Sequence, residues 1–432
     1  MKEKTLFFRY VAQNIFGMLG LSFYILADTF FISKAQGANG ITALNLVLPM
    51  YSLLFAIGAM IGIGSAIRYT ISKTQGKDNC DHYFFHALLW AFLISIPFIL
   101  VGLFFPGKLL ALLGADEIIV MTGTDYTRIF MLFAPLFMWN HICNAFVRND
   151  GGPTIAMLAT LISSLFNVLM DYILMFPLQM GMSGAALATA LSPVLGIIIC
   201  CIHIFSKKNH IRLVVCRPKI SLLFHSCQVG ISAFVGEISS GVITMSFNYL
   251  ILKLAGNTGV AAYGIVANCA LVGTSIFNGV AQGSQPLISS AYGKGDPKTV
   301  NLLRKLSFIT AFILAVCLYL GIYLYASPIA GLFNGEQDPT LQKLAETGLC
   351  LYFIGFFFSG INIVGCSYFS ATAHAKEALV ISILRGFILI LLAAFLLSDF
   401  FGMTGVWLAY GVCECITALV LLGLLHHIRR SH

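Results

Sequence analysis

The chain has 432 residues, of which 59% are hydrophobic and only 10% are charged, and its mean hydropathy is +0.91. Soluble domains carry about 25% charged residues, so this composition excludes an ordinary soluble protein and indicates an integral membrane protein. The formal net charge of +8 is therefore no sign of nucleic-acid binding, and no nucleic-acid partner is expected. The 12 cysteines lack CxxC or metal-ligand spacing and are expected to be small buried hydrophobes, with no cofactor.

Apolar segments separated by polar residues, Gly and Pro predict transmembrane helices, each of which needs about 20 residues to cross a bilayer. The sequence predicts an all-α membrane protein with twelve of them, at about 7–34, 41–74, 83–105, 119–147, 154–176, 182–206, 221–252, 257–291, 303–326, 342–370, 376–397 and 403–427. The first segment runs long and lacks a small-residue cleavage site, so we expect a retained helix rather than a signal peptide.

The basic residues fall mainly on one side of these helices. Nineteen Lys and Arg side chains lie on the side of the N-terminus and five on the other, while Arg385 lies inside a helix. Because basic loops stay on the cytoplasmic side, both termini are expected in the cytoplasm and the protein in the plasma (inner) membrane.

The two halves of the chain resemble each other. The string GANGITALNLVLP from Gly37 aligns with GNTGVAAYGIVAN from Gly256, and GMSGAALA at 181–188 matches GMTGVWLA at 402–409. Recurring small residues at helix contacts are the simpler explanation, but the fixed register favours a duplication. We therefore expect two pseudo-symmetric six-helix lobes, an N-lobe at 1–206 and a C-lobe at 221–432, joined by a basic cytoplasmic linker at 207–220. Such repeats are common in secondary transporters.

Acidic residues inside the membrane are costly, at roughly 2.5–3.5 kcal/mol each on insertion scales, and tend to be functional. Only Asp28, Asp171, Glu237 and Glu414 fall well inside the predicted helices. With a rise of 1.5 Å per residue, Asp28 lies roughly 28 Å and Asp171 roughly 25 Å from the cytoplasmic ends of their helices, and so at one level.

Two further polar residues are predicted near that level. Asn167 lies one turn below Asp171 on the same helix face, and Thr189 enters from the next helix. Carboxylate, amide and hydroxyl oxygens suit a hard cation such as Na⁺. Neighbouring carboxylates equally suit a proton. The alternative is a pair of carboxylates satisfied by hydroxyl and amide donors and serving only helix packing.

The other two acids are predicted to have different roles. Glu237 has no counterpart in the first lobe and is predicted to face the cleft between the lobes, where it would attract a cationic substrate; the alternative is a Glu satisfied by Ser239 or Ser240. Glu414 lies at a depth comparable with that of Arg385, which predicts an internal ion pair.

Several strings together resemble the MATE (multidrug and toxic compound extrusion) family over essentially the whole chain. They are ADTFFISKAQGANGITALNLVLP near the start, RNDGGPTIAM at 148–157, FNVLMDYILM at 166–175 and VANCALVGTSIFNGVAQGSQPLISSAYGKGD at 266–296. The resemblance implies a cation-coupled antiporter that exports small organic, often cationic, compounds by alternating access. We expect the protein to be a monomer.

The resemblance also implies roles for individual residues. Asp28, Asn167, Asp171 and Thr189 match the family's N-lobe cation site. Tyr126 and Asn144 match positions that line the cavity in similar proteins, and Glu237 matches the glutamate found in the seventh helix of many bacterial members. All three are expected to bind substrate. Two features depart from the pattern: the string INIVGCSYFSATA of the tenth helix has no acid, and the first helix has Gln13 and no proline.

Other functions fit the sequence less well. A primary pump would need a phosphate-binding GxxxxGK[ST] loop, which the sequence lacks. An intramembrane protease is suggested only by GKGD at 293–296, which falls in a predicted cytoplasmic loop, so we expect no enzyme and no catalytic residues. The duplicated lobes favour alternating access over a channel. A lipid-linked precursor flippase of the same superfamily is the main alternative to a cation-coupled (Na⁺ or H⁺) multidrug antiporter.

Overall fold

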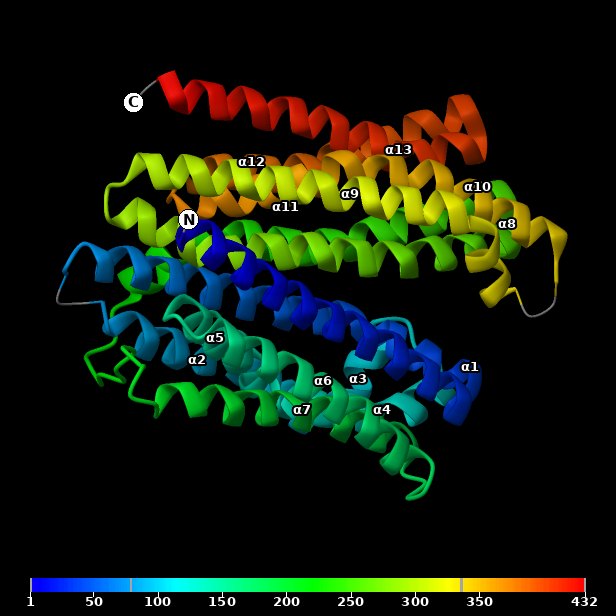
Figure 1. Cartoon of the computed structure of the whole chain (residues 1–432). Coiled ribbons are helices and arrows are strands. Elements are labelled where there is room, and N and C mark those ends of the chain that lie inside the picture. Colours follow the sequence, from blue (N-terminus) through cyan, green and yellow to red (C-terminus); the bar gives the residue numbers. More distant parts are fainter. Residues whose placement is uncertain (1, 78–79, 335–336, 431–432) are drawn as a thin grey trace.

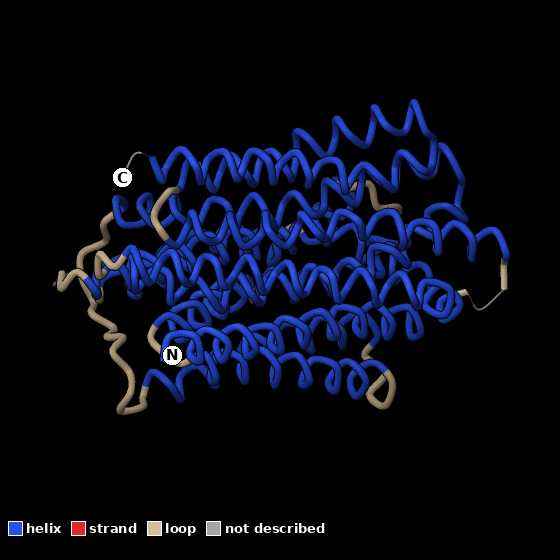
Figure 2. Tube along the Cα trace, turned by 45° about the horizontal axis from the view of Figure 1, so that its top comes forward, coloured by secondary structure: helices blue, strands red, loops and turns tan. Residues whose placement is uncertain are grey.

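The computed structural model describes residues 2–77, 80–334 and 337–430. This part of the chain consists of helices joined by loops, the longest of them between Ile204 and Ile220, and contains no strand (Figure 2). The elements are α1 (Lys2–Thr74), α2 (His82–Phe104), α3 (Pro106–Leu112), α4 (Glu117–Leu132), α5 (Ala134–Asn149), α6 (Pro153–Met175), α7 (Gly181–Ile204), α8 (Ile220–Gly293), α9 (Pro297–Phe333), α10 (Pro339–Tyr352), η1 (Phe353–Gly355), α11 (Phe356–Ala371), α12 (Ala375–Ile383), η2 (Leu384–Ile388) and α13 (Leu389–Arg430).

Glycines with positive φ break the longest helices. Gly37 in α1, Gly256 in α8 and Gly402 in α13 have φ of 60°, 61° and 55°. Only glycine adopts these backbone angles, with ψ between −156° and −134°, without strain. Each long helix is therefore two helices that meet at a sharp bend.

The number of membrane spans follows from these breaks. Among the described residues, nine helices or helical runs are long and apolar enough to cross a membrane, and ten if α4 and α5, bent by 48°, form one span. Pro135 explains that bend, because it cannot donate a helical hydrogen bond. Separating the segments on either side of Gly256 and of Gly402 gives twelve spans, as the sequence predicts.

The structure adjusts one predicted helix substantially. The ninth span was expected at 303–326, but α9 runs from Pro297 to Phe333. It begins six residues earlier because the Asp296 side chain accepts hydrogen bonds from the backbone N–H groups of Lys298 and Thr299, with Pro297 in the first turn. The turns of α9 before residue 303 and after residue 326 extend beyond the predicted span.

Two lobes lie side by side, an N-lobe of α1–α7 and a C-lobe of α8–α13 (Figure 1). Their hydrophobic cores are largely separate, one formed by residues between 32 and 211 and one mainly by residues between 247 and 413. Glycines with positive φ recur at matching places, Gly37 with Gly256 and Gly181 with Gly402, which supports the duplication. The exact bounds of the linker stay a prediction.

The lobes meet chiefly through α1 and α8. Both chain termini lie at one end of the bundle, here called the terminal end, and the bends at Gly37 and Gly256 lie at the opposite, hairpin end (Figure 1). Towards the terminal end the backbones touch: Gly230 of α8 lies against Met60, and Gly283 against Val11. Towards the hairpin end, a side chain at Gly236 or Gly241 would meet no atom within 4 Å. The lobes are thus closed at the terminal end and separated towards the hairpin end.

Candidate cation-binding site

Asp28 of α1 and Asp171 of α6 lie together inside the N-lobe. Their residues are 8% and 0% exposed, and their carboxyl groups are in hydrogen-bonding contact. One oxygen of each, Oδ1, is buried with no hydrogen-bond partner among the described residues. Two adjacent carboxyl groups avoid repulsion by sharing a proton or by holding a cation, so this pair is incomplete without one.

Asn167 and Thr189 complete one side of this site. With its amide nitrogen turned towards Asp171, Asn167 donates to Asp171 Oδ2 at 3.1 Å and accepts from the Thr189 backbone N–H at 3.3 Å. Asn167 lies on the same face of α6 as Asp171, one turn away. Since α6 packs closely on α7, Thr189 reaches the same place. The structure therefore brings together the four residues predicted for the cation site.

Three tyrosines also lie around the site. Tyr24 and Tyr51 share a hydrogen bond of 2.8 Å between their hydroxyls, and Tyr24 lies within electrostatic reach of both carboxyl groups. Tyr126, 2% exposed, reaches the Thr189 hydroxyl. Tyr51 is held by stacking on Phe55, with the ring centroids 4.2 Å apart. The sequence predicted Tyr126 but missed Tyr24 and Tyr51.

The atoms that could bind an ion here are oxygens of two carboxyl groups and several hydroxyls, while Asn167 supports the pair by donating to Asp171. This chemistry fits a hard monovalent cation or a proton, and the two unpartnered carboxyl oxygens are the atoms on which either would bind.

Asn144 lies deeper, towards the terminal end. Its amide bonds the Asn140 side chain at 3.1 Å and accepts from the Thr160 hydroxyl at 3.5 Å. Thr160 precedes Asn167 by two helical turns on α6. Asn144 therefore belongs to a polar cluster below the carboxylate pair and not to the pair itself.

Glu237 is exposed on α8, in the region where the lobes separate. It begins a polar stripe with Ser240 and Thr244, at helical spacing and also exposed. The hydroxyls of Ser239 and Ser240 bond backbone carbonyls, of Gly236 and Glu237, and not the Glu237 carboxylate. A polar stripe on a membrane helix faces water rather than lipid, so the position of Glu237 between the lobes stays a prediction that this stripe supports.

The C-lobe holds the predicted ion pair. Arg385 Nη2 lies 2.6 Å from Glu414 Oε1, and Glu414 is 2% exposed. The prediction of an internal ion pair is therefore confirmed.

Polar contacts close the terminal end between the lobes, and the sequence did not reveal them. Arg148 donates to Asn14 at 3.1 Å and, across the interface, to Gln282 at 2.5 Å. Asn149 and Gln285 exchange two amide hydrogen bonds, at 3.3 and 3.2 Å. These bonds must break if the lobes separate at this end.

Asp150 ties the linker to the N-lobe beside these contacts. Its buried carboxylate lies 2.7 Å from Lys73 Nζ and 3.1 Å from His203 Nε2, and accepts from the His210 backbone N–H at 2.8 Å. Burial alone would raise the pKa of Asp150, but the bonds from His203, Lys73 and His210 outweigh it and lower the pKa to about 2. Asp150 is thus a charged anchor of the linker.

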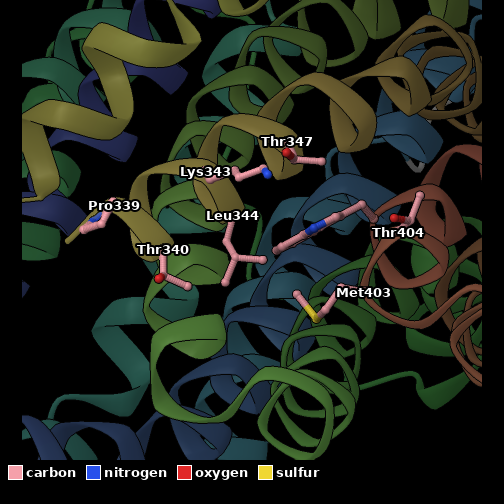
Figure 3. A pocket seen from close by; sticks show the side chains of 8 residues that line it. Pro339, Thr340, Lys343, Leu344, Thr347, Met403 and Thr404 are labelled. Atoms are coloured by element: carbon pink, nitrogen blue, oxygen red, sulfur yellow. The ribbon is translucent and has the colours of Figure 1, made fainter.

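A separate pocket of about 470 Å³ lies at the hairpin end of the C-lobe (Figure 3). Lys343 and Thr347 of α10 and Met403 and Trp407 of α13 line it. None of the predicted site residues lines this pocket.

The fold and the buried polar centres define a two-lobed helical membrane transporter. A family model, MatE, matches residues 14–173 and 233–396. The chain belongs to this family, whose members are transporters and not enzymes.

Relatives and solved structures agree with this assignment. The chain is 26% identical to "Multidrug export protein MepA" of Staphylococcus saprophyticus, over 99% of this chain and 97% of the relative. It is 27% identical to MepA of Staphylococcus aureus strain MSSA476, over 94% and 90%.

Among solved structures, "Outward-facing conformation of a multidrug resistance MATE family transporter of the MOP superfamily" has a TM-score of 0.92 at 22% identity, covering 99% of this chain and 96% of that one. A MOP superfamily transporter from Pyrococcus furiosus, described by a binding pocket of reverse polarity, has a TM-score of 0.91 at 21% identity, with the same coverage. At these identities the likeness concerns the fold alone.

Proposed function

We propose that this protein is a cation-coupled antiporter that exports organic, multidrug-type compounds, cationic ones among them. The observation that carries the proposal is the contact between Asp28 and Asp171, with an unpartnered oxygen on each. Multidrug export is the activity in the names of the MepA relatives, which align over nearly the whole chain. We further propose a monomer in the plasma membrane with both termini in the cytoplasm.

In the proposed cycle the hairpin end faces outwards. The carboxylate pair takes Na⁺ or H⁺ from outside, which rearranges the N-lobe and favours release of the substrate. The bonds of Arg148 and Asn149 across the terminal end then break, the ion leaves to the cytoplasm, and a new substrate enters with the help of Glu237. Coupling requires only that ion and substrate favour different states.

The polarity of the cavities argues for exporting cations rather than for a flippase of anionic lipid-linked precursors. Glu237 is exposed on α8, and we place it on the substrate path. Arg385 is neutralised by Glu414 at 2.6 Å. The deep charge that remains accessible is therefore negative.

Dye efflux from proteoliposomes tests this function. We expect efflux when either a Na⁺ gradient or a proton gradient is imposed alone, depending on the coupling ion, and loss of that efflux in Asp171→Asn. If neither gradient drives efflux, the antiporter assignment is wrong and a flippase or channel takes its place.

A further inference from the structure

Among the described residues of the C-lobe, Glu414 is the one deeply buried acid, and its carboxylate is fully bonded. Glu414 Oε1 accepts from Arg385 Nη2 at 2.6 Å and from Nε at 3.1 Å. Oε2 accepts from the Asn362 amide at 2.6 Å. Unlike Asp28 and Asp171, this carboxylate leaves no oxygen without a partner.

The guanidinium is held by its own set of contacts. Arg385 donates to the Ser359 hydroxyl at 3.2 Å, and that hydroxyl accepts from Tyr410 at 2.7 Å. Arg385 lies in η2, a single π-helical turn that interrupts the span between α12 and α13. Such turns are rare and often occur at functional sites. In this wider turn, the Arg385 carbonyl accepts a hydrogen bond from the Cys413 thiol at 3.5 Å.

The oxygen atoms around the guanidinium are of the same kinds as those in the N-lobe site. Glu414 supplies a carboxylate and Ser359 a hydroxyl, and the Asn362 amide donates to Glu414 as the Asn167 amide donates to Asp171. The register that aligns Gly181 with Gly402 also aligns Thr189 with Tyr410. The helix that carries Glu414 and Tyr410 therefore corresponds to the helix of Thr189. The N-lobe centre pairs two acids, whereas the C-lobe centre pairs an acid with an arginine.

We propose that Arg385 is a tethered cation: its guanidinium takes the place of a diffusible cation in a carboxylate–amide–hydroxyl site, so that the C-lobe is permanently loaded. A guanidinium stays charged and cannot dissociate. Replacing it by a neutral side chain would leave Glu414 buried with a net charge, which the lobe would satisfy by binding a monovalent cation, Na⁺ or a proton. The N-lobe is then the lobe that exchanges ions, and this last step alone rests on the proposed function.

Other titratable groups around the pair do not supply a second charge of either sign at neutral pH. Those that interact with it are Tyr352 of α10, Cys366 of α11, and Tyr410 and Cys413 of α13. From α8, the neutral Ser239 packs against Gly386 of the π turn. The charge balance of the centre therefore depends on Arg385 and Glu414.

The test is the thermal unfolding of Arg385→Met in a background of Asp28→Asn and Asp171→Asn, which removes the N-lobe carboxylates. We expect R385M to have a lower Tm than the background, and we expect its Tm to rise by roughly 2 °C or more with saturating Na⁺ or on acidification. Choline in place of Na⁺ separates the two ions: a response to Na⁺ alone assigns the metal ion, and a response to pH alone assigns the proton. If the Tm of R385M responds to neither Na⁺ nor pH more than the Tm of the background does, the proposal is wrong.

Two matched variants separate charge from packing. R385K keeps the cation, and R385M with Glu414→Gln removes both charges, so neither is expected to respond to Na⁺ or to acidification more than the background does. A larger response in either variant contradicts the tethered-cation role. Should R385M not accumulate, its yield is compared with that of R385M–E414Q: recovery by E414Q supports the proposal, and no recovery shows that Arg385 is needed for packing. Because these readouts need no transport, they stand even if the dye-efflux test fails.

Discussion

The two lobes share a fold but balance their buried charge differently. In the N-lobe, Asp28 and Asp171 face each other with one unpartnered oxygen each. In the C-lobe, Glu414 faces Arg385 at 2.6 Å. A like-charged pair is stable only with an ion that comes from outside the chain, whereas an opposite pair is complete by itself. Duplicated scaffolds can thus divide their tasks, one lobe exchanging ions and the other holding a fixed charge.

The largest effect is expected from Asp171→Asn. The amide has the shape of the carboxyl group but no charge and no site for a proton, so dye efflux from cells should fall to the rate of cells without the protein, while the variant still elutes as a folded species in gel filtration. Asp125→Asn is the matched control, because Asp125 has a side chain 61% exposed. Wild-type efflux by D171N contradicts the cation site.

Glu414→Gln should destabilise the fold, because it leaves the Arg385 charge without its counter-ion. Breaking a buried pair from one side costs about 3–5 kcal/mol. Asp28→Asn removes one of two like charges and should preserve or raise stability. Thermal unfolding of both variants in detergent compares the lobes directly; Tm shifts of the same sign and size would mean that the two centres do not differ as described.

Asp150→Asn tests the charge cluster that holds the linker in the N-lobe. In the described part of the C-lobe, the corresponding turn before α12 holds Thr372 and His374 instead, which are hydrogen-bonded at 3.0 Å. The pKa of Asp150 is lowered from 3.8 to about 2, so its ionised form stabilises the fold above about pH 4, by about 2 kcal/mol, and this contribution is lost as the pH falls towards 2. D150N should lose it at neutral pH and show a flatter pH dependence of Tm. An unchanged profile, equal to that of D125N, argues against the anchor.

The smallest effect is expected from Gln285→Ala, which removes the amide bonds to Asn149 that join the lobes. A net loss of about 1 kcal/mol shifts the ratio of closed to open terminal ends about fivefold. Distances between spin labels on the two lobes at this end report the populations. The exposed Gln75→Ala is the control, and an identical distance distribution in Q285A would show that these bonds do not hold the lobes together.

The sequence predicted the helices well because apolar length and Gly/Pro punctuation dominate the behaviour of a chain in a membrane. It placed Asp28 and Asp171 at one level because helical rise converts position directly into depth. Tyr24 was within reach of the same reasoning, since it lies four residues before Asp28 on one helix face.

Other features depend on how helices rotate and dock, which sequence position does not fix. Tyr51 comes to the site from the second span, whose rotation is set by packing against α4, where the Tyr51 ring stacks on Phe130. The bonds of Arg148 and Asn149 to α8 exist only when the lobes are closed at the terminal end. The π turn at Arg385 is set by local packing and has no sequence signature.

Counting the ions bound per chain compares the lobes most directly. Radioactive Na⁺ binding, together with proton release or uptake, is measured on the purified protein, on Asp28→Asn with Asp171→Asn, and on Glu414→Gln. We expect one exchangeable cation in the wild type, none in the double variant, and one in E414Q. Undiminished binding in the double variant, or loss of an exchangeable cation in E414Q, would contradict the assignment of ion exchange to the N-lobe.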